Sequence, residues 1–404
     1  LEMFSEEYLS YLAKLRFTGD VRAVREGEIV FPYEPIVTVS APMLEAQLVE
    51  TALLTFINHQ TLIASKAAKI CAAAGGGVME FGLRRAQGAD AGVYGARAAM
   101  IGGCVGTSNV YAGKLFHVPV SGTMAHSWVM NFPSEVEAFR AYAECFPDNC
   151  LLLVDTYDTL RSGVPNAITV FRELREKGYE PKGIRLDSGD LAYLSKKARE
   201  MLDEAGFGNA IICASGDLDE TLIRSLKEQG ARIDTWGVGT KLITSADMPA
   251  LGGVYKLAAV YENGKEIPKI KLSDTTEKIT NPGVKEVLRI YDAATDKAIA
   301  DYIVRAGERV DTSKPLTIFH PVDTWKRMTI ENFRVRDLRE DLFRGGKRVA
   351  PERTLAEIAA YRKSEMSRFW EEYLRQDMPH IYKVDLSDAL YGLKQELVEE
   401  YRGQ

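Results

Sequence analysis

One histidine of this chain lies in a segment whose neighbours could support phosphate chemistry. His126 stands in "SGTMAHSWVM" (121–130), directly after the β-branched run "HVPV", and is one of five histidines. A histidine beside an apolar run is commonly a packing residue, but a neutral imidazole is also a competent nucleophile towards a phosphoryl group. Its role depends on which other residues reach the same end of the predicted sheet.

Small and acidic residues follow five apolar runs of the chain. The runs end in Ser121-Gly122-Thr123, Asp155-Thr156, Asp187-Ser188-Gly189-Asp190, Ser215-Gly216-Asp217 and Gly237-Val238-Gly239-Thr240. In a parallel sheet all of these turns lie at the carboxyl edge, where loops converge. Glycines there let backbone N–H groups approach a phosphate, helped by the helix N-termini beyond. Each turn alone could be ordinary helix capping, but five in succession predict an anion-binding edge.

The turns differ in charge, which indicates two kinds of contact. "SGD" at Ser215 and "GVGT" at Gly237 are rich in glycine and suit a phosphate monoester held by backbone N–H donors. "RLDSGD" brings together Arg185, Asp187 and Asp190, whose carboxylates suit ribose hydroxyls or a Mg²⁺ that holds phosphate oxygens. A sugar phosphate with an additional diphosphate would use both kinds of turn.

An earlier segment, "MEFGLRRAQG", offers an aromatic plane beside paired cations. Phe81 could stack on a flat ring, and Arg84 and Arg85 could grip anions. The alternative interpretation is an exposed helix end with solvated arginines.

The elements that carry these turns repeat at a regular interval. The predicted strands start at Val118, Leu151, Ile184, Ile211 and Thr235, which is 24 to 33 residues apart. Amphipathic helices are predicted between them at 134–145, 164–177, 191–205 and 218–228. This is the spacing of βα units, so we expect a parallel sheet buried on both faces, either open or closed into a barrel.

The remaining chain is predicted to form a second domain around this core. We expect residues 1–116 to form the N-terminal part of this second domain and residues 117–260 to form the α/β barrel core. Residues 261–404 are expected to form hairpins, a flexible loop and a C-terminal helical part, which partly returns to the second domain. The predicted elements are a small β-meander at 27–43, a long helix at 44–76, a hairpin turning at Asn263-Gly264, a second hairpin at 289–304 and a charged helix at 352–375. We also expect further residues upstream of Leu1.

Composition limits the class of protein. A length of 404 residues with 46% hydrophobic and 27% charged residues is ordinary for a globular protein of two or three domains. The net charge of −6 argues against a dedicated nucleic-acid binder. No apolar run reaches the ~18 residues that span a bilayer. The five cysteines form no C-x-x-C pair and are expected to be buried thiols in a reducing cytoplasm.

These motifs together resemble the nicotinate phosphoribosyltransferase family. The similar segments are "EFGLRRAQG", "VPVSGTMAHSW", "GIRLDSGDL", "ASGDLDE", "GVGT" and "KLSDTTEKITNPGVKEVLR", in the family's order over essentially the whole chain. The resemblance implies an irregular, TIM-like α/β barrel of the type II phosphoribosyltransferase group, with a second α+β domain from N- and C-terminal segments. It also implies a cytoplasmic homodimer with shared active sites, in which an upstream tyrosine stacks on the ring bound by the neighbouring subunit.

The implied reaction joins nicotinate to phosphoribosyl diphosphate, giving nicotinate mononucleotide and diphosphate, the first step of NAD salvage from nicotinate. The implied cofactors are Mg²⁺ and, as co-substrate, ATP, which is hydrolysed to ADP and phosphate. No residue is assigned as a metal ligand, and neither nucleic acid nor a membrane is an expected partner.

The resemblance also implies roles for individual residues. His126 matches the histidine that such enzymes phosphorylate from ATP, and Asp187 matches the carboxylate near the ribose. Phe81 matches the aromatic that stacks on the pyridine. Arg84 and Arg185 match arginines that line the nicotinate and phosphate pocket.

Three glycines and two lysines complete the implied site. Gly216, Gly237 and Gly239 match backbone that holds the 5′-phosphate, and Lys271 and Lys285 match flexible-loop lysines that face diphosphate. Other residues of the turns are expected to contact substrate as well: Ser121, Gly122, Thr123, Asp190, Ser215, Asp217 and Thr240.

Three other functions are compatible with parts of the pattern. A nicotinamide phosphoribosyltransferase would want a carboxylate near the ring, whereas "VSGTMAH" and "RRAQG" offer hydroxyl and cation. An aldolase- or isomerase-like barrel usually needs a lysine or a His/Glu base at a strand end, and none of the five quoted ends has a lysine. A non-catalytic nucleotide sensor on the same fold is the third alternative.

Overall fold

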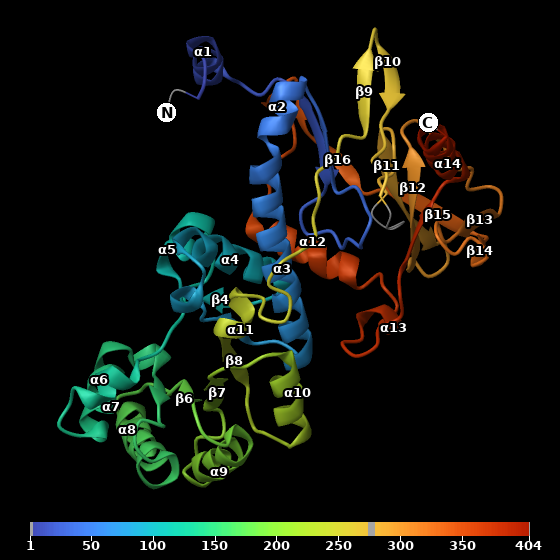
Figure 1. The fold of residues 1–404 in the computed structure, drawn as a ribbon. Helices are drawn as coiled ribbons and strands as arrows, with labels where there is room; N and C mark the ends of the chain where they lie inside the picture. Colours follow the sequence, from blue (N-terminus) through green and yellow to red (C-terminus); the bar gives the residue numbers. More distant parts are fainter. Residues whose placement is uncertain (1–2, 274–278, 404) are drawn as a thin grey trace. The chain divides into compact units, whose positions relative to one another are not determined.

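The computed structural model describes residues 3–273 and 279–403. The chain divides into two compact units (Figure 1). One, here called the barrel unit, is Phe56–Gly252, and the other, the terminal unit, combines Leu1–Thr55 with Gly253–Gln404. The terminal unit is therefore built from both ends of the chain.

The barrel unit contains a six-stranded sheet in which every ladder is parallel. Its strands are β3 (Val78–Glu80), β4 (Gly106–Thr107), β5 (Leu151–Leu153), β6 (Gly183–Leu186), β7 (Ile211–Ser215) and β8 (Thr235–Val238). Their order in space is β4-β3-β8-β7-β6-β5. Because β8 pairs with β3, the first strand of the unit lies inside the sheet and not at its edge. This confirms the predicted α/β class with a parallel sheet.

Helices cover the strands, and their positions agree with the predicted periodicity. In chain order they are α3 (Glu50–Ala74), η1 (Leu83–Arg85), α4 (Ala89–Gly102), α5 (Val110–Phe116), α6 (His126–Met130), α7 (Glu135–Cys145), η2 (Pro147–Asn149), η3 (Thr159–Gly163), α8 (Val164–Glu176), α9 (Leu191–Glu204), α10 (Glu220–Glu228) and α11 (Thr240–Ile243). Helix α9 packs against β6 and β7 (Figure 1). Strands β5 to β8 are short and mostly buried, as expected for strands covered on both faces.

Two features of the barrel differ from the sequence-based expectation. The unit begins at Phe56, well before residue 117, because β3 pairs with β8 across more than 150 residues of chain. The strand expected around 117–123 is reduced to one bridge between Val120 and Thr107. Pro119 has no N–H to donate and takes part only through its carbonyl, which accepts from Thr107 N at 3.0 Å.

The terminal unit contains antiparallel sheets and hairpins. One sheet has the order β17-β16-β1-β2, a second has β15-β11-β12-β18, and β10-β9 and β13-β14 are two-stranded. The bounds are β1 (Asp20–Val24), β2 (Val37–Ser40), β9 (Ala259–Glu262), β10 (Lys265–Pro268), β11 (Lys285–Asp292), β12 (Ala298–Arg305), β13 (Leu316–Phe319), β14 (Arg327–Ile330), β15 (Phe333–Asp337), β16 (Arg339–Arg344), β17 (Lys347–Arg348) and β18 (Lys383–Leu386). The helices are α1 (Glu6–Lys14), α2 (Met43–Leu48), α12 (Leu355–Met366), α13 (Glu371–Leu374) and α14 (Asp388–Arg402).

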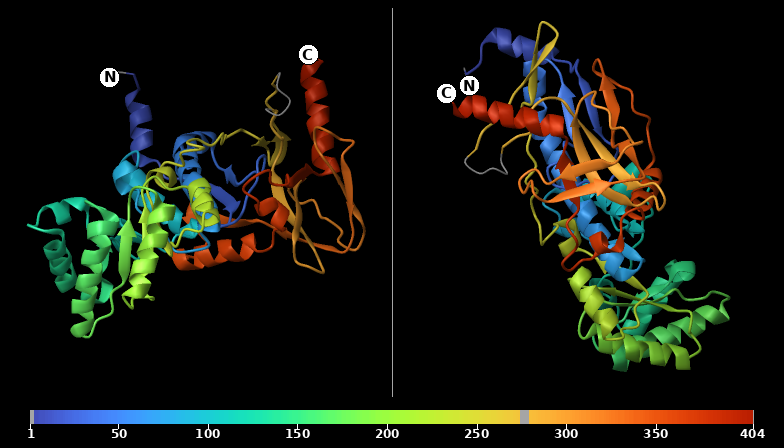
Figure 2. Two further views of the ribbon diagram at one scale, coloured as in Figure 1. Left: turned by 90° about the horizontal axis from the view of Figure 1, so that it is seen from below. Right: turned by 90° about the vertical axis from the view of Figure 1, so that its right-hand side faces the viewer.

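Both predicted hairpins are present in this unit. The β9–β10 hairpin, which projects from its unit in Figures 1 and 2, turns through Asn263 and Gly264 with φ of 52° and 77°. Positive φ at both central residues is the requirement that favours Asn-Gly at such turns. The second hairpin is β11–β12. The expected meander keeps only β2, and the expected helix at 352–375 is divided between α12 and α13.

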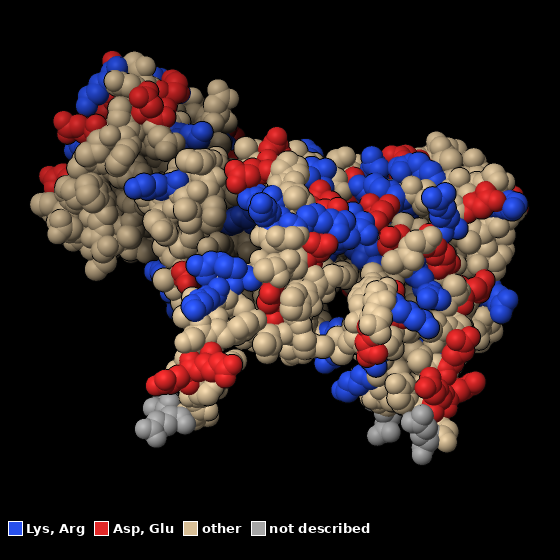
Figure 3. All heavy atoms as spheres, turned by 90° about the horizontal axis from the view of Figure 1, so that it is seen from above, with Lys and Arg blue, Asp and Glu red and all other residues tan. Residues whose placement is uncertain are grey.

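Charged side chains of both signs occur on the face of the molecule that Figure 3 presents. Figure 3 shows lysines and arginines interspersed with aspartates and glutamates on the face that it presents. Within 3–273 and 279–403, no helix is long and apolar enough to cross a membrane. Cys104, Cys150 and Cys213 are buried as expected, whereas Cys71 is half-buried and Cys145 is exposed at the end of α7. The expectation of five buried thiols was therefore wrong for Cys145.

Candidate active site

Arg185 is the centre of a hydrogen-bond network at the carboxyl edge of the barrel. At the end of β6, its Nε donates to Ser215 Oγ, its Nη1 to Thr123 Oγ1 and its Nη2 to Asp187 Oδ1, each at 2.7 Å. The side chain is 17% exposed. A guanidinium has five N–H groups, so within the described part of the chain these contacts leave two for a ligand. Three residues from different predicted turns thus orient one cation.

Asp187 is held as an ionised carboxylate by its neighbours. It accepts hydrogen bonds from Arg185 and from the hydroxyl of Ser215. Burial alone raises the pKa of this carboxyl, but the hydrogen bond from Ser215 and the charge of Arg185 outweigh burial, so its pKa lies below the ordinary value. The site therefore presents a fixed negative charge at neutral pH.

His126 faces this carboxylate from the first turn of α6. Its Nδ1 lies 3.1 Å from Thr156 Oγ1 and its Nε2 lies 3.6 Å from Asp187 Oδ2. The imidazole is 39% exposed, which leaves it accessible to a ligand. A hydroxyl on one nitrogen and a carboxylate near the other orient the ring, as nucleophilic or acid–base chemistry requires.

Asp155 and Thr156 are functional candidates to which the sequence reasoning assigned no role. Asp155 Oδ2 accepts from the backbone N–H of Asp187 at 2.9 Å and from Ser188 Oγ at 2.6 Å. It therefore fixes the turn that carries Asp187. The signal was present in "LLVDTYD", because both residues directly follow a predicted strand.

The donor set fits a magnesium ion that arrives with a phosphorylated ligand. Asp155 Oδ1 is a buried oxygen without a hydrogen-bond partner among the described residues. Asp187 supplies a second carboxylate nearby. No group of three or more His, Cys, Asp or Glu side chains suited to a metal occurs in the described ranges. Mg²⁺ commonly takes one or two protein carboxylates together with water and phosphate oxygens, which agrees with this set.

Phe81 follows β3, and its ring packs directly on Gly237. A Cβ at Gly237 would lie 2.5 Å from two ring carbons of Phe81, so only glycine leaves room for this ring. The Arg185 guanidinium carbon is 5.7 Å from the ring centroid. A flat ligand stacked on Phe81 would therefore lie within reach of a cation.

Glu80, which precedes Phe81, is buried and hydrogen-bonded to the residues around it. It is fully buried, and its carboxyl accepts from the backbone N–H of Gly82 and from Thr107 Oγ1. Burial raises the pKa of this carboxyl above its ordinary value. These contacts join the end of β3 to β4 and to the turn that precedes Arg84, which is exposed in η1.

Two glycine turns shape the same edge at β7 and β8. Gly216 has φ +96°, and a Cβ there would lie 2.3 Å from the carbonyl oxygen of Asp187. Gly239 precedes the first turn of α11, which begins at Thr240. The neighbouring Asp217 also has positive φ and is exposed. The Gly216 turn therefore lies against Asp187, and the Gly239 turn lies against the backbone of Phe81 and Gly82.

The other residues predicted for the site have varied environments. Ser121 and Gly122 are exposed beside Thr123, and Ser121 N donates to Thr107 O. Asp190 is the N-cap of α9, where its side chain accepts from Tyr193 N at 3.0 Å. Capping accounts for this contact, and the predicted substrate contact of Asp190 stays a prediction.

Lys271 and Lys285 belong to the terminal unit. Lys271 is exposed. Lys285 is buried, and its ammonium donates to the carbonyls of Asn281 and Gly283 at 2.8 and 2.5 Å. Burial lowers the pKa of Lys285 to about 8. Their predicted contact with diphosphate stays a prediction.

Comparison with known proteins assigns the chain to a family. Residues 77–295 match the nicotinate phosphoribosyltransferase (NAPRTase) family, residues 1–58 match its N-terminal domain and residues 284–394 its C-terminal domain. The chain belongs to the nicotinate phosphoribosyltransferase family. A relative named nicotinate phosphoribosyltransferase from Bacillus subtilis is 51% identical, over 99% of this chain and 82% of its own length.

More distant relatives and solved structures agree with this assignment. The Dictyostelium discoideum nicotinate phosphoribosyltransferase is 36% identical, over 96% of this chain and 74% of its own. The crystal structure of human nicotinic acid phosphoribosyltransferase has a TM-score of 0.85 at 30% identity, covering 98% of this chain and 86% of that one. A nicotinate-nucleotide pyrophosphorylase from Pyrococcus furiosus has a TM-score of 0.68 at 26% identity, covering 90% and 84%. The fold is that of type II phosphoribosyltransferases.

Proposed function

We propose that this protein transfers the phosphoribosyl group of phosphoribosyl diphosphate to nicotinate, giving nicotinate mononucleotide and diphosphate. The observation that carries the proposal is the Arg185 guanidinium, oriented by three side chains and lying 5.7 Å from the ring of Phe81. A pyridine stacked on Phe81 would present its carboxylate to the two remaining N–H groups. The names of the relatives support the same substrate.

Transfer requires little covalent chemistry from the protein. The bond from the sugar C1 to diphosphate breaks and the leaving group takes the electron pair, so the ribose becomes oxocarbenium-like before the pyridine nitrogen bonds to C1. The Asp187 carboxylate stabilises this positive charge because it is ionised and held in place. Mg²⁺, when bound, neutralises charge on the diphosphate, and Asp155 and Asp187 are its candidate ligands.

We further propose that His126 accepts a phosphoryl group from ATP. One ring nitrogen attacks the γ-phosphorus, the bond to the bridging oxygen breaks, and ADP leaves with that electron pair. Thr156 on Nδ1 and Asp187 near Nε2 hold the imidazole in place. Water then hydrolyses the phosphohistidine to free phosphate. A homodimer with shared active sites is part of the same proposal.

The test measures diphosphate released from phosphoribosyl diphosphate with nicotinate, with nicotinamide and with neither. Release that depends on nicotinate supports the proposal. If release depended on nicotinamide instead, the protein would be a nicotinamide phosphoribosyltransferase. No release with either pyridine, at saturating Mg²⁺ and ATP, would favour a non-catalytic sensor. ADP production in the same assay tests the role of ATP.

A further inference from the structure

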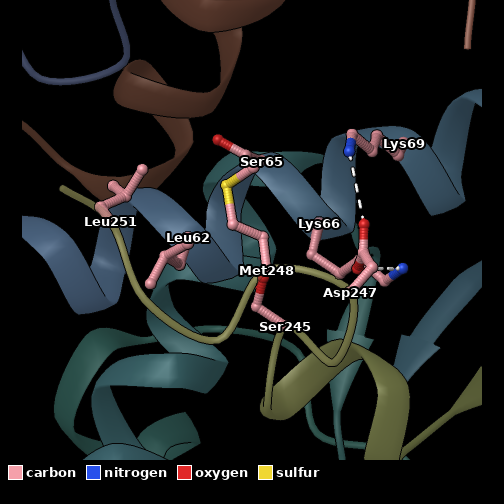
Figure 4. A pocket seen from close by; sticks show the side chains of 8 residues that line it. All are labelled: Leu62, Ser65, Lys66, Lys69, Ser245, Asp247, Met248 and Leu251. Carbon is pink, nitrogen blue, oxygen red and sulfur yellow. Dashed lines mark ion pairs between the residues drawn. The ribbon is translucent and has the colours of Figure 1, made fainter.

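Lys66 is a buried lysine that connects separate elements of the barrel unit. It lies on α3 and is 4% exposed. Its Nζ lies 2.7 Å from Glu220 Oε2 and 2.6 Å from Asp247 Oδ1, and Figure 4 shows the latter contact beside Ser245 and Met248. Burial alone lowers the pKa of a lysine, but hydrogen bonds to Asp247 and Glu220 outweigh burial and raise it. The contact is therefore ionic at neutral pH.

The two carboxylates follow the two glycine turns of the site. Glu220 is the first residue of α10, shortly after Gly216 in the chain. Asp247 lies in the turn that ends α11, the short helix that begins after Gly239. Helix α3 is not part of either loop. Lys66 on this helix therefore contacts both loops from outside, through Glu220 and Asp247.

We propose that Lys66 is a positioning residue that holds the Gly216 and Gly239 turns at the separation required by the 5′-phosphate of phosphoribosyl diphosphate. The inference rests on the proposed function, which makes these turns the phosphate site. Without the ammonium, the buried Glu220 and the exposed Asp247 are no longer connected through one cation, so the two loops are free to move apart. Displacements of about 1 Å are enough to weaken a poised site strongly.

Lys69 supplies a matched control, one helical turn further along α3. It is 50% exposed and lies 3.5 Å from the other oxygen of Asp247 (Figure 4). Both lysines line the same pocket together with Leu62, Ser65 and Leu251. Removing Lys69 takes away a cation of the same pocket without breaking the connection to Glu220.

The experiment compares Lys66→Gln with Lys69→Gln and with the conservative Lys66→Arg. The Michaelis constants for phosphoribosyl diphosphate and for nicotinate are measured separately, with the melting temperature as a check on folding. We expect Lys66→Gln to raise the Michaelis constant for phosphoribosyl diphosphate about tenfold. The Michaelis constant for nicotinate should change less than about twofold. Lys69→Gln should match the parent protein, and Lys66→Arg should recover most of the loss.

A second variant tests the inference in case Lys66→Gln does not fold. Lys66→Met combined with Glu220→Gln and Asp247→Asn removes the cation and both carboxylates, so no unpaired buried charge remains. A folded variant with unchanged affinity for phosphoribosyl diphosphate, or with equal losses for both substrates, would overturn the inference.

A binding measurement separates this inference from the proposed function. Protection against thermal unfolding by ribose 5-phosphate needs no catalysis, and Lys66→Gln should weaken it about tenfold. If the parent protein binds ribose 5-phosphate but transfers nothing to nicotinate, the proposed function fails while this effect still supports the positioning role. Equal protection of parent and variant overturns the positioning role, whatever the activity.

Discussion

His126 and Asp187 lie opposite one another, with Nε2 of the imidazole 3.6 Å from Oδ2 of the carboxylate. The other oxygen of Asp187 accepts from Arg185. One carboxylate therefore links the residue proposed for phosphorylation to the cation proposed for nicotinate. The predictions below for His126, Asp187 and Arg185 therefore all concern groups that meet at this carboxylate.

Replacing His126 by alanine should abolish ATP hydrolysis while some ATP-independent transfer survives. In the proposed mechanism His126 accepts the phosphoryl group and takes no part in breaking the glycosyl bond. The measurement is acid-labile phosphate on the protein after incubation with ATP, together with nicotinate mononucleotide formed with and without ATP. An acid-labile phosphoprotein formed by the variant would show that another residue is modified.

Replacing Asp187 by asparagine should reduce turnover far more than nicotinate affinity. The charge matters most when the ribose becomes cationic, so its loss raises the barrier more than it weakens ground-state binding. Steady-state kinetics check this through kcat and KM for nicotinate. Unchanged kcat with raised KM would reassign Asp187 to substrate binding.

The same carboxyl should also contribute a pH-dependent part of the stability. Its folded pKa lies below the ordinary value of 3.8, so this contribution is complete above that value and is lost as pH falls through the folded pKa. Melting temperatures between pH 3 and 7 should therefore decline less steeply in acid for Asp187→Asn than for the parent. Parallel curves would mean that Asp187 is not preferentially ionised in the folded state.

Replacing Arg185 by glutamine should raise the KM for nicotinate and reduce the preference of the enzyme for nicotinate over nicotinamide. A charge-assisted hydrogen bond contributes about 1.5–3 kcal/mol, so its loss corresponds to roughly one to two orders of magnitude. Arg84→Gln is the comparison, because the exposed Arg84 beside Arg85 should act more on phosphoribosyl diphosphate. An unchanged ratio of nicotinate to nicotinamide in Arg185→Gln would place the selectivity in the backbone around Ser121, Gly122 and Thr123.

Replacing Gly237 by alanine should displace the ring of Phe81. The new Cβ would lie 2.5 Å from two ring carbons, closer than such contacts allow, so we expect the nicotinate KM to rise about tenfold. Gly252→Ala is a suitable control, because a Cβ there meets nothing within 4 Å. Equal nicotinate KM values for the two variants would mean that the ring is not the stacking surface. Gly237 was expected from the resemblance to hold phosphate, and that role stays a prediction.

The βα repeat, the grouping of the site residues at one edge of the sheet and the family could all be predicted from the sequence. Strand and helix periodicity are local properties of the chain, and residues that end consecutive parallel strands must reach the same edge. The sequence alone therefore places Arg185, Asp187, Ser215 and His126 at one edge of the sheet. The Asn263-Gly264 turn was predictable for the same reason, since its backbone requirement lies in two adjacent residues.

The position of β3 in the sheet and the side chains that support the site could not be predicted from the sequence. The pairing of β3 with β8, the packing of Phe81 on Gly237 and the contacts of Lys66 with Glu220 and Asp247 all join residues about 150 or more positions apart. No local pattern encodes such contacts, because they depend on the order of the strands in the sheet and on which helix then covers them. For the same reason a lysine in the middle of a long helix looks solvated in the sequence, although folding buries it between two carboxylates.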